Sequence, residues 1–586
     1  MRRVARRRVV GGLAASAALA LGCAGPSAPL RPPLGPSATP ARPRRSPPDT
    51  VALGLAVEPT TLAAPPGGEG WGGAAYANRL VANLLMCQLV GVDGRGQPFP
   101  DLAETVPTLE AGGAHLVGEG DLRQLQSTFR LRRGARWSDG QPLTARDVVF
   151  TWQLSLNPLF APTLATAHRY ERVEAPDDAT VVFTAFSERS ARAAAAREPN
   201  RYGFLREQRG PVLDPLYLFG LPRSWIYPEH VVGRLVDGEP ARSPRAAELL
   251  TASPYARAPV GGGPFALQEW QPGRLLAFAA RADYHRGAPR LRAVSLSLAT
   301  PERLADALAA GELDLLTAEA LGRPLAAPAG LRLASTASTA AEGIDLNLDH
   351  PALRDRAVRE ALLRALDRPA LAGATGLAPA DPAGARYPHD PAGAAELLRA
   401  AGWEPGPDGP RLRDGRRLEL RLLTTDDPPR RRLAELIRDA LAPLGVALTL
   451  EARRPAALLD QLGRRDFDLA LYAQLDGLDR LADLAERYAA AAIPTAQAPW
   501  RGENYPGLRS PALDQLFADA AATLERARRA ELLRRAEDAL LLELPRLPLA
   551  AHTRAAALSP ELAGLELAAP PIAESWNAHQ WGLVVR

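Results

Sequence analysis

The chain has 586 residues, of which 46% are hydrophobic and 23% charged, a composition typical of globular proteins. A chain of this length exceeds one hydrophobic core, so we expect two to four domains. The net charge of +4 comes from the first 49 residues, because residues 50–586 carry 61 basic and 65 acidic side chains. The body of the protein is therefore mildly acidic, which excludes a nucleic-acid partner held by a basic surface.

The first 22 residues have the pattern of a bacterial export signal. An arginine-rich start precedes the apolar run Val9 to Leu21, which is too short for a stable transmembrane helix. The run ends at Cys23 in a sequence that resembles the lipid-attachment motif of bacterial lipoproteins, although Ala20 stands where leucine is usual. We predict a signal peptide over 1–22 and lipidation of Cys23. An ordinary signal peptide with a chance cysteine and a twin-arginine signal are the alternatives.

Residues 23–49 are rich in Pro, Ala, Ser and Arg and lack the apolar residues that a core needs. We expect a disordered, semi-rigid tether. An anchor, a tether and a globular body together predict a protein of the cell envelope, held in the periplasm or at the outer face of a membrane.

The body begins with short apolar segments separated by turns. Val51–Leu55 predicts a first strand, residues 78–90 a buried helix or extended segment, and residues 91–100 a hairpin. Cys87 has no second cysteine in the body to pair with, so we expect a small buried hydrophobic residue.

Residues 127–152 predict a strand, a tight turn and a helix. Apolar and polar residues alternate at the start, Gly140 is typical of the turn, and Thr144 stands three residues before Asp147 as in a capping box. Such units are common in α+β proteins, so the pattern alone assigns no function.

The C-terminal third has the rhythm of a parallel α/β sheet. Leucines alternate over 418–422, an amphipathic helix over 433–444 ends at Gly445, and alternation returns over 446–450. This is a βαβ unit, for which we expect a right-handed crossover. The remaining predicted elements are a strand over 466–472, helices over 513–524 and 532–540, and a closing strand after Pro545 and Pro548.

We find no motif of an enzyme, a nucleotide site or a metal site. Gly-x-Ser-x-Gly, His-Glu-x-x-His and phosphate-loop patterns are missing, and the eight histidines are scattered. Adjacent acids such as Asp426 and Asp427 are typical of turns. We therefore predict no catalytic residue, no metal and no cofactor.

Short motifs occur in a fixed order along nearly the whole mature chain. They include Arg136–Val148, Gly261–Phe265, Ala310–Asp314 and Ala365–Arg368. In identity and order these motifs closely resemble the bacterial extracellular solute-binding proteins of family 5, which belong to peptide and nickel import systems.

The resemblance implies an α/β, periplasmic-binding-protein-like fold of type II, with two main lobes joined by a hinge and an inserted third lobe. It implies lobe I over 50–80, 211–300 and 546–586, an inserted lobe II over 81–210, and lobe III over 301–545. A ligand would lie between lobes I and III, which close by a hinge motion.

The resemblance also implies one ligand contact. In peptide-binding members an aspartate after a strand like the one at 466–472 pairs with the peptide α-amino group, and the matching residue here is Asp476. A carboxylate in a desolvated cleft is a sound partner for an ammonium group. The chain departs from the family at Ala473 and Arg480, where Trp and Pro are frequent, so a role of Asp476 as a helix N-cap stays open.

Three aromatic residues, Trp71, Tyr76 and Trp500, are expected in loops that face the ligand, with core packing as the alternative. The family glutamate after the first helix falls at Cys87, a second departure from the pattern.

The expected function is binding, not catalysis. The protein would capture short peptides and deliver them to an ABC import transporter, formed by a permease and an ATPase. We expect a monomer attached to the membrane by its N-terminal lipid. The alternatives are another solute (a metal chelate or an oligosaccharide), a sensor subunit that presents a ligand to a membrane receptor, and a secreted hydrolase.

Overall fold

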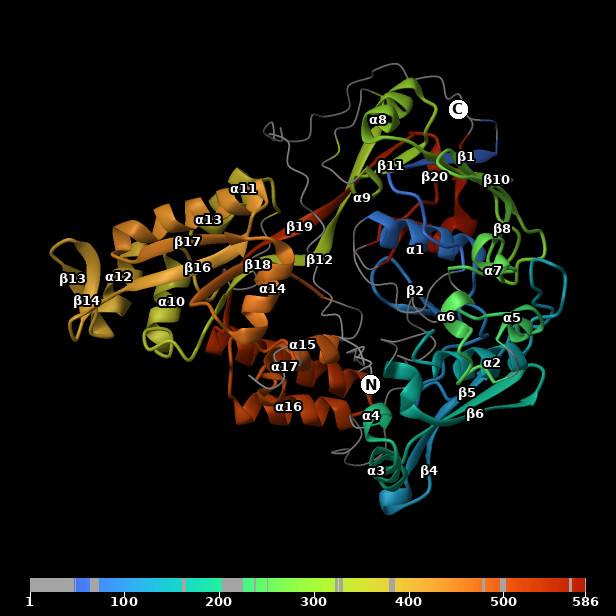
Figure 1. The fold of residues 1–586 in the computed structure, drawn as a ribbon, viewed down its shortest axis with the longest axis horizontal. Helices are drawn as coiled ribbons and strands as arrows, with labels where there is room; N and C mark the ends of the chain where they lie inside the picture. The colour runs from blue at the N-terminus through green and yellow to red at the C-terminus, as the bar shows by residue number, and fades with distance from the viewer. Residues whose placement is uncertain are drawn as a thin grey trace, which may run out of the picture.

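The computed structural model has a mixed α/β fold built on one large sheet (Figure 1). The predicted signal peptide, Cys23 and most of the tether lie outside the part of the chain that the structure describes. The described residues are 47, 49–63, 73–160, 165–202, 225–236, 239–249, 251–321, 325, 330–378, 385–476, 480–495, 502–568 and 572–584.

Within these residues, ten strands form the large sheet, and parallel and antiparallel neighbours are mixed. The spatial order is β17 (Ala447–Arg453), β16 (Glu419–Thr425), β18 (Leu469–Leu475), β12 (Arg332–Leu346), β19 (Arg546–Leu558), β11 (Leu315–Thr317), β1 (Thr50–Leu55), β10 (Ala293–Leu298), β9 (Leu275–Ala280) and β8 (Phe265–Gln271).

The two long strands β12 and β19 carry the chain across the middle of the sheet. Residues 347–545 follow β12 and precede β19, so these strands are their covalent links to the rest of the chain. The β12–β19 register shifts between Ala337 and Ala341, and again where Gly343 meets Pro548. Extra residues in a ladder weaken its pairing and bend the strand. We call Ser338–Ala340 of β12, with the facing part of β19, the crossover.

Core 1 is the hydrophobic core on one side of the crossover. Val51, Leu296 and Phe278 of the central strands are fully buried in it, together with Leu80 of α1. β1 is an apolar run from Val51 onward, whereas β10 alternates buried apolar residues with half-buried positions. The elements around core 1 are α1 (Gly73–Leu85), α5 (Glu229–Leu235), α6 (Ala246–Leu249), α7 (Pro254–Arg257), α8 (Pro301–Ala310), α9 (Ala318–Leu321), β20 (Leu562–Ala563), η6 (Glu574–Gln580) and β21 (Gly582–Leu583).

Core 2 is the hydrophobic core on the other side. Adjacent Leu422 and Leu423 of β16 are both buried, but in different clusters, because successive strand residues point to opposite faces. Helices therefore cover both faces of this half of the sheet. The elements are α10 (Arg356–Arg364), α11 (Arg368–Thr375), α12 (Pro391–Ala400), β13 (Glu404–Gly406), β14 (Gly409–Arg413), β15 (Arg416–Arg417), α13 (Pro428–Leu441), η4 (Ala442–Leu444) and α14 (Pro455–Arg464).

A third layer of helices lies below core 2 in Figure 1. Leu484, Leu513, Phe517 and Leu532 pack into a cluster of their own, which we call the helical core. It is formed by α15 (Arg480–Tyr488), α16 (Pro511–Ala522) and α17 (Arg526–Glu543), with η5 (Ala490–Ala492) between them.

Core 3 contains residues of the segment 127–152, for which a strand, a turn and a helix are predicted. Trp137 is fully buried, and its indole nitrogen donates to Asp147, 3.3 Å away. The predicted capping box between Thr144 and Asp147 is present at the start of α2. The elements around core 3 are β2 (Val90–Val92), β3 (Pro98–Pro100), β4 (Ala114–Val117), η1 (Gly120–Leu122), β5 (Gln124–Arg130), α2 (Ala145–Ser155), η2 (Ala165–Arg169), β6 (Tyr170–Asp177), β7 (Thr180–Ala185), α3 (Glu188–Arg197) and α4 (Pro199–Tyr202).

Most predicted elements are present near their predicted places. β16, α13 and β17 form the predicted βαβ unit with a parallel pair, and Cys87 is fully buried. Pro548 is predicted to precede the closing strand, but it lies inside β19, at the register shift. The pairing is already irregular there, so the N–H that proline lacks removes few hydrogen bonds from the ladder.

The lobe division stays a prediction. Leu304 and Leu315 fall within the predicted lobe III but are buried in core 1. We therefore propose that lobe III begins after Leu321.

Candidate functional site

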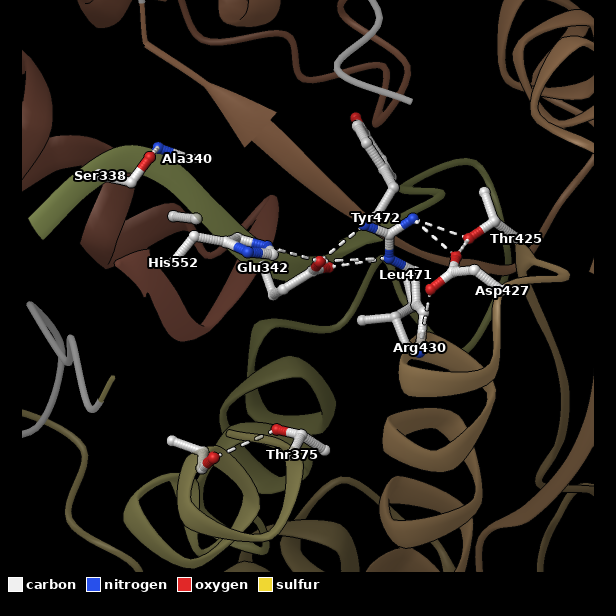
Figure 2. A network of polar contacts seen from close by, with 12 residues as sticks. Ser338, Ala340, Glu342, Thr375, Thr425, Asp427, Arg430, Leu471, Tyr472 and His552 are labelled. Carbon is white, nitrogen blue, oxygen red and sulfur yellow. Dashed lines mark hydrogen bonds and ion pairs between the residues drawn. The ribbon is translucent and has the colours of Figure 1, made fainter. Parts of the chain in front are cut away.

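A charged network lies beside the crossover (Figure 2). Glu342 of β12 accepts hydrogen bonds from Arg430 of α13 at 2.7 Å and contacts Nε2 of His552, on β19, at 3.0 Å. Arg430 also donates to Thr425 at 2.7 Å and lies 3.3 Å from Asp427, the N-cap of α13. The network thus joins both crossover strands to one helix of core 2.

Glu342 is ionised in this setting. Burial alone would raise its pKa, but the Arg430 guanidinium and the His552 hydrogen bond outweigh burial and lower the pKa to about 2. Only 4% of its side chain is exposed, so the ion pair is held away from water.

A second ion pair lies on the opposite face of β12, because three positions along a strand reverse the direction of the side chain. Arg546 donates to Asp345 at 2.7 Å and to the backbone carbonyl of Tyr472 at 2.7 Å. The Tyr472 hydroxyl also donates to Asp345. Asp345 is fully buried, so both faces of β12 carry a buried and paired acid next to the crossover.

Asp476 lies at the end of β18, beside the crossover. Its backbone N–H donates to the carbonyl of Thr339 at 3.2 Å. Its carboxylate is paired twice, with Arg487 and with Arg480, both at 2.6 Å. About a third of the side chain is exposed, so a ligand group can reach it only by sharing the carboxylate with two guanidinium groups.

Tyr76 lies in helix α1, and this corrects the expectation of a loop. Its side chain is buried, and its hydroxyl is hydrogen-bonded to Glu574 and, at 2.9 Å, to Thr317. The polar atom of Tyr76 thus already has protein partners. Trp71 and Trp500 fall outside the described residues, so their roles stay predictions.

The buried hydroxyl of Tyr76 belongs to an acidic cluster in core 1. Arg554 of β19 donates to Glu319 at 2.9 Å and lies 3.9 Å from Glu574. Two acids thus share one arginine, and one carboxylate oxygen of each has no hydrogen-bond partner among the described residues. Burial is the largest cause that raises the pKa of Glu574, with the Arg554 charge opposing it.

A pocket with a mixed lining lies between α1, the β2–β3 hairpin and η6. Arg79, Asn83, Arg286 and Trp576 contribute to its walls. Its acid, Asp101, already contacts the Tyr284 hydroxyl and His285, each at 3.1 Å. Burial would raise the pKa of Asp101, but His285 and Arg286 lower it to about 2. The charge of Asp101 is thus compensated within the protein.

Among the described residues, no group of three or more His, Cys, Asp or Glu side chains is arranged to hold a metal ion. No helix in the same ranges has both the length and the apolar character needed to cross a membrane.

Sequence reasoning missed Glu342, Arg430, His552, Arg546 and the Glu319–Glu574 pair. A signal was present, because Glu342 and Asp345 are acids within a run that forms a buried strand. Their partners lie 88 to 210 residues away, so the pairs are visible only in the fold.

The comparisons with known proteins agree with this architecture. The oligopeptide-binding protein AppA of Bacillus subtilis is 23% identical over 467 residues, which cover 76% of this chain and 77% of AppA. The structure of AppA in complex with a nonapeptide aligns with 92% of this chain and 99% of that chain, at 21% identity and a TM-score of 0.57.

Two further proteins span a comparable length. Protein XP55 of Streptomyces lividans is 27% identical over 512 residues, covering 80% of this chain and 86% of XP55. NikZ of Campylobacter jejuni, solved with Ni(L-His), aligns with 92% of this chain and 100% of that chain, at 19% identity and a TM-score of 0.59.

The structures of AppA and NikZ confirm the periplasmic-binding-protein-like α/β fold. The family model described as the middle region of bacterial extracellular solute-binding proteins, family 5, matches residues 98–484, well over half of the chain. The chain therefore belongs to the bacterial extracellular solute-binding proteins of family 5.

Proposed function

We propose that this protein captures short peptides and delivers them to an ABC import transporter. The observation that carries the proposal is the crossover, where two irregular strands are the covalent links between core 1 and residues 347–545. Strands with weakened pairing can bend, and bending would open and close the space between the two parts around a ligand. The choice of peptide is supported by AppA, a relative named for binding oligopeptides.

Asp476 is the ligand contact that we propose first. Its place beside the crossover supports a role in ligand binding. About a third of its side chain is exposed, so the carboxylate can accept a hydrogen bond from a ligand. The pairing with Arg480 and Arg487 predicts that a peptide ammonium group would share this carboxylate, and would bind less tightly than to a free one.

A metal chelate is the second candidate. NikZ with Ni(L-His) and a periplasmic EDTA-binding protein share the fold. A chelate of net negative charge would find Arg480 beside Asp476, with 39% of its side chain exposed.

A thermal-shift screen separates these candidates. A bound ligand raises the melting temperature by an amount that grows with RT ln(1 + [L]/Kd). We expect peptides of two to nine residues to raise it in a dose-dependent way, and Ni(L-His), Fe(III)-EDTA and oligosaccharides to leave it unchanged. If chelates alone raise the melting temperature, the ligand is a chelate and not a peptide. Release of free amino acids from the added peptides would indicate a hydrolase.

The envelope location is part of the proposal. We propose that Cys23 carries a lipid, that residues 23–49 tether the body to the membrane, and that the protein acts as a monomer beside its permease and ATPase. Metabolic labelling with a fatty-acid probe should mark the wild-type chain and leave Cys23→Ala unlabelled. Equal labelling of both would show that the lipid is elsewhere.

A further inference from the structure

The turn that joins α16 to α17 touches core 3. The backbone N–H of Arg526 donates to a carboxylate oxygen of Glu110 at 3.4 Å, across 416 positions of sequence. Beside it, Leu524 is half-buried and packs against the apolar residues of core 3. Figure 1 shows the same neighbourhood, with the helical core lying beside α3 and α4 in the lower part of the view.

This contact differs from the crossover in kind. The crossover strands join residues 347–545 to core 1 through the backbone. The turn instead reaches core 3 through the side chain of Leu524 and the hydrogen bond from Arg526 to Glu110. Glu110 is exposed, and its pKa is lowered first by a backbone N–H of its own residue and then by that of Arg526. A small, solvent-exposed contact of this type can separate and reform without unfolding either partner.

Helix α17 connects this turn to the neighbourhood of Asp476. Arg480, which pairs with Asp476, also donates to Glu537 of α17 at 2.7 Å. The helix has 18 residues and spans about 27 Å. It is a continuous element with the turn before its first residue and Glu537, the partner of Arg480, in its C-terminal half.

We propose that the α16–α17 turn, Thr523–Glu525, is a latch. Seated on core 3, it holds the part built from residues 347–545 in the closed position, and its release lets that part swing about the crossover. Core 3 then takes part in closure. This role is separate from any contacts that the parts built on core 1 and core 2 make with a ligand. The latch contact itself requires no ligand, so it can be tested apart from the proposed function.

Hydrogen exchange on the full chain tests the latch. In Leu524→Asp, the amides of residues 106–113 and 524–526 should exchange several-fold faster, while those of core 2 keep their rates. Leu542→Asp is the matched control, because Leu542 lies at the far end of α17, the helix that follows the turn, with 45% of its surface exposed. It should leave all these rates unchanged, and only Leu524→Asp should increase the radius of gyration in small-angle scattering.

A second variant avoids the core. Glu110→Ala removes the acceptor of the Arg526 amide and leaves every leucine in place, so that one amide should exchange several-fold faster even if Leu524→Asp fails to fold. Equal exchange of the Arg526 amide in Glu110→Ala and wild type, or equal effects of Leu524→Asp and Leu542→Asp, would overturn the proposal.

Discussion

At the scale of residues, the charges near the crossover are satisfied in pairs. Glu342 with Arg430 and Asp345 with Arg546 are almost completely buried, and each acid has more than one donor. Removing one member of such a pair leaves a buried charge without compensation, which costs about 3–5 kcal/mol.

Arg430→Met is therefore expected to lower the free energy of unfolding by about 3 kcal/mol, measured by urea denaturation. Arg432→Met on the same helix should change it by less than about 0.5 kcal/mol, because 58% of the Arg432 side chain is exposed. The double variant Glu342→Gln with Arg430→Met should regain much of the loss. An equal effect of the two arginine variants would contradict this account of the network.

Asp476→Ala should weaken peptide binding about tenfold, the effect of losing one charge-assisted hydrogen bond of about 1.4 kcal/mol. Arg480→Gln should strengthen binding of peptides with a free α-amino group, because it removes one competitor for the carboxylate. Calorimetric titration of both variants measures the two changes. Unchanged affinity in Asp476→Ala would show that the ammonium group binds elsewhere.

Glu574 makes stability depend on pH. Its pKa is raised on folding, so its contribution is fully present below the unfolded value of about 4.5 and is lost as the pH rises through the folded value. Glu574→Gln cannot ionise, and its melting temperature relative to wild type should rise between pH 5 and pH 8. Glu566→Gln, at an exposed position, should show no such trend. A constant difference across this range would mean that Glu574 is charged throughout.

At the scale of elements, the sequence predicted local units well and junctions less well. The Thr144–Asp147 box and the β16–α13–β17 unit are encoded within a few or a few dozen residues, and both are confirmed. The shifts in β12 and β19 depend on pairing across about 200 residues, so neither the bulge nor the internal place of Pro548 could be predicted from local pattern.

Gly343 tests the tight packing of these strands. A methyl group there would lie 2.8 Å from the carbonyl of Leu547 and 2.6 Å from the guanidinium of Arg546. Gly343→Ala should cost about 1–3 kcal/mol of unfolding free energy, measured by denaturant titration. Gly373→Ala, inside α11 with nothing within 4 Å, should instead gain up to about 1 kcal/mol. Equal changes in unfolding free energy for Gly343→Ala and Gly373→Ala would contradict this packing at the crossover.

At the scale of the whole molecule, motifs in a fixed order predicted the family and the fold, and both are confirmed. The ligand contacts could be predicted far less well. The resemblance predicts Asp476, but its two arginine partners depend on the formation of α15. The hydroxyl of Tyr76 is hydrogen-bonded to Glu574, 498 positions later in the chain. Motifs therefore report the framework that the family shares, and the binding chemistry depends on residues that meet only after folding.

The central claim is that the two parts joined by β12 and β19 close around a peptide. Isothermal titration calorimetry with peptides of defined length tests it most directly. We expect saturable heat with one peptide per chain and a negative heat-capacity change, as apolar surface is buried on closure. The claim would be contradicted if no peptide gave saturable heat while a chelate or an oligosaccharide bound one to one.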